Sequence, residues 1–399
     1  MFRKEMGRPK DDKLPKKVKK RHLLDYSILI PYLILTVIGL MMVYSASSYS
    51  LISQGKNPIT DMVKQAIFLF LSIILMGILY KMKLSMLKNL KFVRIFVALV
   101  LGLMVIAFAF KTVNGAHGWI QIPGLGTIQP VEFWKFVMIW MLAAQISDRQ
   151  VLIPDKMVDA VKVPVGLCAL SMGILALYPD FGNAAIIALL LIVMLMISGI
   201  NYLYGYIIAF GTFAFSILTM FIIRITNGSF LPSHVASRFA VFLNPFKDEF
   251  GDGHQLVNGY YAMFNGRLFG LGLGNSIQKK GFLSFAASTD FIFAIVVEEL
   301  GLIGAIFILG LLLFLVGRII LIGIRSNDAF NSMICLGVGS LFLIQIFINL
   351  GGITGLIPLT GITFPFFSQG GSSLIVLSAC VGLVLNISAD EKKKKLMLY

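Results

Sequence analysis

The feature that most constrains this chain is a series of long apolar runs separated by short polar segments. Most of these runs approach the about 20 residues that an α-helix needs to cross the hydrocarbon core of a bilayer. Hydrophobic residues make up 58% of the 399 residues and charged residues 13%, far from the composition of soluble domains. The ten runs cover residues 22–48, 62–80, 92–110, 131–147, 163–178, 184–198, 202–223, 290–317, 330–350 and 373–388. We therefore predict an all-α polytopic membrane protein with ten transmembrane helices.

The distribution of Lys and Arg predicts how the chain is oriented. With ten helices and the N-terminus in the cytoplasm, 24 basic residues lie in cytoplasmic segments and 9 in outer ones, as the positive-inside rule requires. Nine helices are the alternative, because the run at 184–198 is short and the break at 199–201 is weak. That alternative would place the basic run at 392–395 outside. We therefore favour ten helices with both termini cytoplasmic.

The chain ends account for much of the net charge of +15. We interpret residues 1–22 as a disordered cytoplasmic basic tail and residues 391–399 as a second cytoplasmic basic tail, on either side of a transmembrane domain at 23–390. Because the positive charge lies in tails and short loops rather than on a folded surface, it does not predict a nucleic-acid partner.

Two segments on the predicted outer side are unusual. Residues 224–289 form a large extracellular loop between the seventh and eighth helices, rich in glycine and aromatic residues. Residues 351–372 contain no charged residue and are broken by glycine and proline. Irregular backbone is tolerated at membrane depth only where protein or a water-filled cavity surrounds it. We therefore predict a re-entrant outer segment at 351–372.

Ionisable side chains near the outer ends of the spans are the candidate functional groups, because charge at membrane depth is costly. Glu132 and Lys135 open the fourth helix, Asp180 precedes the sixth, and Asp290 opens the eighth. In the predicted topology helices four, six, eight and ten all begin on the outer side. Their free N–H groups and partial positive charge suit a phosphate or diphosphate. The sequence therefore predicts an outward-facing site for an anionic ligand.

These side chains also have purely structural interpretations. Glu132 and Lys135 have the i,i+3 spacing of an ion pair on one helix. Asp180 and Asp290 stand where acids commonly favour a helix start. Both interpretations stay open on these residues alone.

Other signals are weaker. Glu298 and Glu299 lie further along the eighth helix and point in different directions, so one of them is a candidate buried hydrogen-bonding group. The glycine-rich segment 270–274 follows no strand and is no nucleotide motif. The four histidines lack a close metal-binding spacing. The sequence therefore predicts no organic cofactor and identifies no metal ligands.

The motifs resemble a known family when they are taken in their order along the chain. They are Asn114-Gly115-Ala116-His117-Gly118-Trp119, Gln129-Pro130-Val131-Glu132 with Lys135, Pro179-Asp180-Phe181-Gly182, Arg238, Asn244-Pro245-Phe246, His254-Gln255-Leu256, Gly270-Leu271-Gly272-Leu273-Gly274-Asn275-Ser276, Thr289-Asp290-Phe291-Ile292-Phe293-Ala294, Glu298-Glu299-Leu300-Gly301, Asn349, Thr360-Gly361, Pro365-Phe366 and Ser368-Gln369-Gly370-Gly371-Ser372-Ser373. This ordered set resembles the SEDS family (shape, elongation, division, sporulation), which contains FtsW, RodA and SpoVE. The resemblance covers residues 23–390. Within the family it is closest to the division branch of Gram-positive bacteria, FtsW.

The resemblance implies a peptidoglycan glycosyltransferase that polymerises lipid II at the division septum. It implies a multi-pass protein of the plasma membrane with its active site on the extracytoplasmic side. The implied partners are a class B penicillin-binding protein, which supplies the transpeptidase, and division-complex membrane proteins of the FtsL, DivIB and DivIC type.

The resemblance also implies roles for individual residues. The essential acid of the family maps onto Asp290, which we expect to act as the general base in an inverting single displacement. A divalent cation, Mg²⁺ or Mn²⁺, is the cofactor we consider for stabilising the diphosphate. The positions expected to bind substrate are Glu132, Lys135, Asp180, Arg238, Trp119, Gln255, Ser368 and Ser372.

The chain departs from the family pattern at two of these motifs. Before Asp290, residues 283–289 lack the Pro, Glu and His that family members often carry, and the segment is one residue longer. Gly118 stands where the family commonly has Arg, so no charge at that position can bind substrate. We therefore assign no role to those missing side chains.

Three alternative functions stay open. They are a lipid II flippase, an elongation polymerase of the RodA type and a noncatalytic division scaffold. A flippase needs polar groups at several depths and near both faces, whereas the polar groups here cluster outward. A scaffold would tolerate substitution of Asp290.

Overall fold

The computed structural model describes residues 20–110, 118–122, 126–150, 153–200, 202–226 and 233–397. In these residues the chain is almost entirely helical, apart from one antiparallel hairpin of two short strands that the hydropathy pattern did not predict. The elements are η1 (Lys20–Leu23), α1 (Tyr26–Ser53), α2 (Thr60–Lys81), α3 (Leu84–Leu87), α4 (Leu90–Ile106), η2 (Ala107–Ala109), β1 (Ile120–Ile122), β2 (Gly126–Ile128), α5 (Pro130–Asp148), α6 (Ile153–Leu177), α7 (Phe181–Met196), α8 (Tyr202–Thr226), α9 (Ser233–Leu243), η4 (Pro245–Asp248), α10 (His254–Gly266), η5 (Ser284–Ser288), α11 (Ile292–Arg325), α12 (Ala329–Ile353) and α13 (Gly371–Met397).

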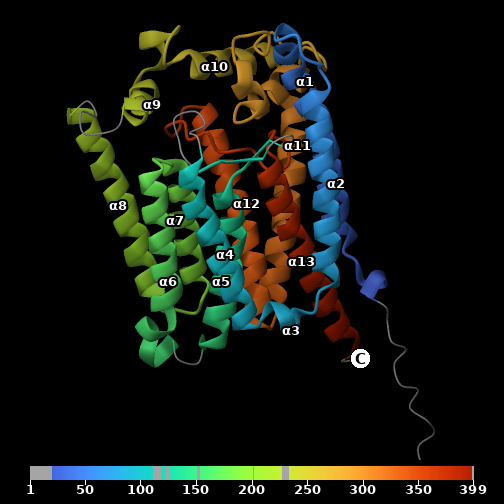
Figure 1. Ribbon diagram of the computed structural model, residues 1–399, viewed down its shortest axis with the longest axis vertical. Coiled ribbons are helices and arrows are strands. Elements are labelled where there is room, and N and C mark those ends of the chain that lie inside the picture. The colour runs from blue at the N-terminus through green and yellow to red at the C-terminus, as the bar shows by residue number, and fades with distance from the viewer. Residues whose placement is uncertain are drawn as a thin grey trace, which may run out of the picture.

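The long helices stand side by side as one bundle, with α9 and α10 at one end (Figure 1). Within the described residues, seven helices are long and apolar enough to cross a membrane: α1, α2, α4, α6, α11, α12 and α13. Helix α7 and part of α8 are shorter apolar helices, and α5 carries Glu132 and Lys135 in its first two turns. The all-α membrane class is thereby confirmed, while the count of ten spans stays a prediction.

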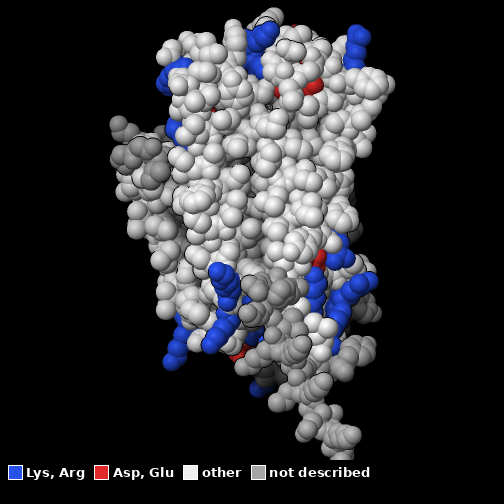
Figure 2. Space-filling model, turned by 90° about the vertical axis from the view of Figure 1, so that its right-hand side faces the viewer, with Lys and Arg blue, Asp and Glu red and all other residues white. Residues whose placement is uncertain are grey.

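Charged side chains mark the two ends of the bundle. Figure 2 shows Lys and Arg gathered near both ends of the face in view, with a broad band between them that carries neither basic nor acidic residues. Such a band is what the hydrocarbon core of a bilayer requires of a lipid-facing surface. It separates the end that carries α10 from the end that carries the C-terminus (Figure 1).

The two ends of the described chain lie together. Lys20 donates a hydrogen bond of 2.6 Å from Nζ to Oδ1 of Asn386 on α13, and the Tyr80 hydroxyl donates to the Lys20 carbonyl at 2.7 Å. Asp25, at the start of α1, forms an ion pair with Lys392 at 3.2 Å. An even number of crossings puts both ends on one side, so this contact fits the predicted topology. The cytoplasmic placement of the termini stays a prediction.

The core of the bundle is built around the C-terminal helices. In the apolar stretch of α13, 94% of residues are buried, and in α12 67% are, whereas α2 has 17% and α4 has 28%. Helices with few buried residues can still be apolar all round, because lipid rather than water covers their outer faces. Helices α12 and α13 therefore form the centre, and α2 and α4 line the periphery.

Helix α11 is broken near its N-terminal end. Its 34 residues would extend about 51 Å as a straight helix, longer than the ~30 Å hydrocarbon core. Gly301 has φ +72° and ψ 177°, which interrupts the helix and separates residues 292–300 from the spanning part. The sequence predicted one uninterrupted helix here. A run of apolar residues does not reveal a single glycine in a left-handed conformation.

The segment at 267–272 fills this break. The Leu271 amide donates to the Glu298 carbonyl at 2.9 Å, and the Gly272 amide donates to the Glu299 carbonyl at 3.0 Å. On the other side of the break, the Leu302 amide donates to the Arg267 carbonyl at 2.9 Å. The loop thus provides hydrogen-bond partners for the backbone carbonyls and the amide that lose their helical partners at the break. The glycine-rich motif has a structural role.

Residues 354–370, which connect α12 to α13, are irregular, and the part at 362–368 is mostly buried against the bundle. The Phe366 ring lies 5.4 Å from the ring of Tyr32 on α1 and 5.5 Å from that of Phe342 on α12, both measured between centroids. Nonhelical backbone is stable at membrane depth under this kind of protein cover. The predicted large loop between α8 and α11 contains α9, η4, α10 and η5.

Candidate active site

Asp290 lies between η5 and α11, just ahead of the short helical segment 292–300. Its side chain keeps some exposure, and the hydroxyl of Thr289 donates a hydrogen bond of 2.8 Å from Oγ1 to its Oδ1. The other carboxylate oxygen receives no hydrogen bond from another side chain in the described part of the chain. The Thr289 hydroxyl therefore orients the carboxylate through Oδ1.

The backbone around Asp290 is fixed by polar side chains from the end of the bundle. The Asn349 amide nitrogen, on α12, donates to the carbonyls of Asp290 at 2.7 Å and of Ile362 at 2.8 Å. The hydroxyl of Ser368 donates to the Thr289 carbonyl at 2.6 Å. Since Asn349 is buried, these bonds act away from bulk water, where they orient strongly. They fix where the Asp290 carboxylate lies.

The surroundings of Asp290 change its acidity. Burial raises the pKa of the Asp290 carboxyl, while the hydrogen bond from Thr289 and the positive charge of Arg238 act in the opposite direction. A carboxylate with a raised pKa is a stronger base and accepts a proton more readily. Arg238 is an exposed residue of α9, and its charge acts on Asp290 from the outer helices.

Glu132 and Lys135 form a buried ion pair on α5. Their Nζ–Oε1 distance is 2.6 Å, and the Lys135 ammonium also donates to Oδ1 of Asn183 on α7 at 3.3 Å. Neither side chain has appreciable exposure, and Oε2 of Glu132 has no partner in the described residues. The structure thus contains the i,i+3 ion pair that the spacing of these two residues predicted. A ligand would reach Lys135 only if the surrounding side chains moved.

Asp180 caps the N-terminus of α7, in agreement with its interpretation as a helix-start acid. Its Oδ1 accepts from the Asn183 amide at 3.1 Å, and its Oδ2 accepts from the Asn183 side chain at 2.9 Å. The side chain of Gln129, just before α5, also donates to Oδ2 at 3.5 Å. The Gln129 backbone amide donates to Oγ of Ser372, on α13, at 3.1 Å. The N-termini of α5, α7 and α13 are therefore linked.

The segment 368–372 connects these three helix starts to Asp290. Ser372, at one end, contacts Gln129, while Ser368 and Gln369, at the other end, hydrogen-bond to the carbonyls of Thr289 and Ser288. Four helix starts with their partial positive charge thus lie around one short segment, as the sequence predicted. The arrangement can bind an anion next to a carboxylate that can accept a proton.

The remaining predicted residues differ in how they relate to this site. The Ser368 hydroxyl is buried and both donates to Thr289 and accepts from the Phe364 amide, so it shapes the site. Gln255 on α10 is exposed, and Trp119 before β1 is partly exposed. Within the described residues no hydrogen bond joins either of these two to Asp290, and their substrate contacts stay predictions.

Asn349, Asn183 and Gln129 were missing from the predicted site, although each is central to its geometry. Asn349 and Asn183 are uncharged amides near the outer ends of apolar runs. A polar amide at membrane depth is itself a signal, because it costs free energy unless it is hydrogen-bonded. That signal is weaker than the one from a charged residue, so these amides were not included among the predicted site residues.

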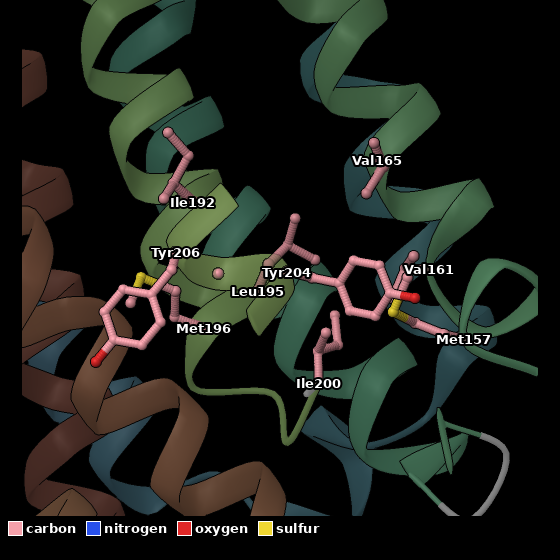
Figure 3. Close-up of a pocket in the computed structure, with 10 residues that line it drawn as sticks. Met157, Val161, Val165, Ile192, Leu195, Met196, Ile200, Tyr204 and Tyr206 are labelled. Carbon is pink, nitrogen blue, oxygen red and sulfur yellow. The ribbon is translucent and has the colours of Figure 1, made fainter. Parts of the chain in front are cut away.

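A separate pocket of about 280 Å³ lies between α6, α7 and the start of α8 (Figure 3). It is near Leu195, at the opposite end of α7 from Asp180. Its walls are aliphatic and methionine side chains with two tyrosines, Tyr204 and Tyr206. Among the described residues that line it there is no Asp, Glu, His, Lys or Arg, and the pocket is not part of the candidate site.

The described residues do not form a complete protein cage for a metal ion. Within the described ranges no group of three or more His, Cys, Asp or Glu side chains lies together. Mg²⁺ commonly uses one or two carboxylates, several waters and substrate phosphates instead of a complete protein cage. Asp180 fits that pattern, because its carboxylate is partly exposed among the linked helix starts.

Known proteins resemble this chain over nearly its whole length. FtsW of Lactococcus lactis subsp. lactis, called a probable peptidoglycan glycosyltransferase, is 44% identical over 95% of both chains. FtsW of Bacillus subtilis, with the same designation, is 37% identical and covers 93% of each chain. Stage V sporulation protein E of Bacillus subtilis is 34% identical over 91% of this chain and 96% of its own.

Solved structures share the fold. A chain from a study entitled "Structural coordination of polymerization and crosslinking by a peptidoglycan synthase complex" matches with a TM-score of 0.72 and 24% identity, over 92% of this chain and 98% of that one. RodA of Thermus thermophilus, a rod shape determining protein, matches with a TM-score of 0.65 and 23% identity, over 92% and 97%.

The family assignment follows from these matches. The family model FTSW_RODA_SPOVE, described as "Cell cycle protein", matches residues 26–393, which include every motif of the candidate site. The resemblance seen in the sequence is thereby confirmed, together with its closeness to FtsW of Gram-positive bacteria. This chain is a multi-pass membrane protein that belongs to the FtsW, RodA and SpoVE family of cell cycle proteins.

Proposed function

We propose that this protein is a peptidoglycan glycosyltransferase that polymerises lipid II, with Asp290 as its general base. Relatives at 44% and 37% identity that carry this designation support the activity. The observation that carries the residue assignment is the position of Asp290: a carboxylate oriented by Thr289 beside a segment that links three helix N-termini. A base beside an anion site is what this reaction needs.

The proposed reaction is one displacement. The 4-hydroxyl of the acceptor sugar attacks C1 of the donor, while the bond from C1 to the diphosphate oxygen breaks and its electron pair leaves with the diphosphate. Asp290 takes the proton of the attacking hydroxyl. Inversion at C1 converts the α-linked donor into a β1–4 bond, so a single positioned base is sufficient.

The leaving diphosphate needs stabilisation of its negative charge rather than a proton. The linked starts of α5, α7 and α13 supply partial positive charge, and Arg238 supplies a full charge near Asp290. We propose that Asp180 would hold a divalent cation, Mg²⁺ or Mn²⁺, together with the substrate phosphates. That cation would neutralise phosphate charge.

We further propose that the site lies on the extracytoplasmic side and that the protein acts at the division septum. The excess of basic residues in the segments at the opposite end supports this orientation. We expect a class B penicillin-binding protein as the transpeptidase partner, with division proteins of the FtsL, DivIB and DivIC type. Large exposed aromatic side chains near α10, Phe250, Phe264 and Phe269, offer apolar surface for membrane or partner.

The proposal is tested with the purified full-length chain, fluorescent lipid II and a denaturing gel that separates glycan polymers. We expect polymer in the presence of the transpeptidase partner, and a measurement without it shows whether the chain is active alone. Transfer of lipid II between leaflets without any polymer would replace the proposal with a flippase. Neither polymer nor transfer would leave a noncatalytic scaffold.

Depletion in cells tests the septal role separately. A division polymerase predicts filaments that fail to form septa. An elongation polymerase of the RodA type predicts loss of cell shape with septation intact, and that outcome would contradict the septal role while leaving the chemistry unchanged.

A further inference from the structure

A buried charged cluster lies at the broken end of α11, outside the residues that the mechanism uses. Lys279, in the loop after α10, forms an ion pair of 2.7 Å from its Nζ to Oε1 of Glu299 on α11. The Ser45 hydroxyl, on α1, donates to Glu299 at 2.7 Å and accepts from Lys279 at 2.9 Å. Lys279 and Glu299 are 3% and 1% exposed, so both charges depend on these partners.

The neighbouring acid organises the same loop. Glu298 accepts hydrogen bonds from the Ser276 hydroxyl, from the Asn265 side chain at 3.1 Å and from the Ile277 amide at 3.2 Å. Glu299 accepts from the Gly274 amide at 3.1 Å. Both acids therefore gather donors of the segment 265–279 onto α11. The sequence had assigned a buried hydrogen-bonding role to only one of them.

The position of this cluster relates it to Asp290 through one short helical segment. Asp290 stands just before residues 292–300, a helical segment of about 14 Å, and Glu299 lies at its other end. Because the helix is interrupted at Gly301, the spanning part of α11 does not fix this segment through a continuous helical backbone. The C-terminal end of the segment 292–300 is held by the loop at 267–279 and, through Ser45, by α1.

We propose that Lys279 and Glu299 are positioning residues that set the placement of the segment 292–300 and, through it, of the Asp290 carboxylate. The inference rests on the proposed function, because it concerns the rate of lipid II polymerisation. Neutralising either partner leaves an unpaired buried charge and removes one of the contacts that hold the loop against α11. Neutralising both leaves no unpaired charge, so the loop can pack again.

The test compares Lys279→Met, Glu299→Gln and the double variant, with steady-state polymerisation of fluorescent lipid II. A small misplacement of a reacting group costs up to about 100-fold in rate, so each single variant should lower kcat about 10- to 100-fold with little change in KM. The double variant should recover at least about a tenth of the wild-type kcat, more than either single variant. Lys280→Met is the matched control, because Lys280 is the adjacent lysine of the same loop and is exposed.

Wild-type kcat in both single variants would overturn the inference, as would a double variant no better than the singles. Should a single variant fail to fold, Ser45→Ala removes only one hydroxyl and should lower kcat about 3- to 10-fold at unchanged KM. An unchanged kcat there would overturn the inference as well. Absence of polymer in the wild type and in Lys280→Met would instead contradict the proposed function, so the two failures are distinguishable.

Discussion

Asn349 offers the sharpest test of how the fold positions its candidate base. Its side-chain amide donates to the Asp290 carbonyl at 2.7 Å and to the Ile362 carbonyl at 2.8 Å, and the residue is buried. In Asn349→Leu both carbonyls lose their donor, and each unsatisfied buried group costs about 1–3 kcal/mol. We therefore expect a loss of about 2–6 kcal/mol in the free energy of unfolding. Release of the Asp290 backbone should also lower kcat by about 10- to 100-fold.

Gln345→Leu is the matched control for this variant. Gln345 lies one helical turn earlier on α12, is also buried, and its amide oxygen and nitrogen both lack a partner in the described part of the chain. Removing an unsatisfied amide should leave stability equal or higher and leave activity unchanged. Thermal unfolding and polymerisation kinetics of the purified variants measure both effects. Equal behaviour of the two variants would refute the reasoning from hydrogen bonds.

Three further predictions concern acidity, backbone and metal. The polymerisation rate should fall as pH drops through the pKa of Asp290, at a pH above the ordinary aspartate value of 3.8, because the base must be ionised. Arg238→Gln should shift this acidic limb to higher pH, and an unshifted limb in a pH–rate profile would contradict the role of its charge. Gly301→Ala should lower the melting temperature, because Gly301 has φ +72° and a Cβ there would lie 2.4 Å from the Gly270 nitrogen. Gly310→Ala is the control: open space surrounds Gly310, so its melting temperature should be equal or higher. Chelation of divalent cations should lower polymerisation and Mg²⁺ or Mn²⁺ should restore it, while full activity in excess chelator would exclude the proposed cation.

The helical class and the starts of several helices could be predicted because they depend on local properties of the sequence. Runs of apolar residues report membrane spans directly, and Asp180 could be placed at a helix start from its position alone. The ion pair of Glu132 and Lys135 follows from helical spacing. Such features need no knowledge of which segments meet in space.

The parts that escaped prediction depend on contacts between distant segments. The break at Gly301 exists because the loop at 267–272 supplies hydrogen bonds to it, and hydropathy does not report that pairing. The hydrogen bond from Ser368 to the Thr289 carbonyl joins distant segments and was not predicted, while the expected contact of Ser368 with substrate stays a prediction. A hydroxyl in a motif has the same sequence signature whether it serves ligand or backbone.

The central claim is that the Asp290 carboxylate accepts the proton of the attacking sugar hydroxyl. The most direct measurement is polymerisation of fluorescent lipid II by purified Asp290→Asn, which keeps the size of the side chain and removes its basicity. Asp252→Asn, at an exposed acid between η4 and α10, is the control. We predict no polymer from Asp290→Asn and normal polymer from Asp252→Asn, with equal melting temperatures. Polymer of normal length and rate from Asp290→Asn would contradict the account.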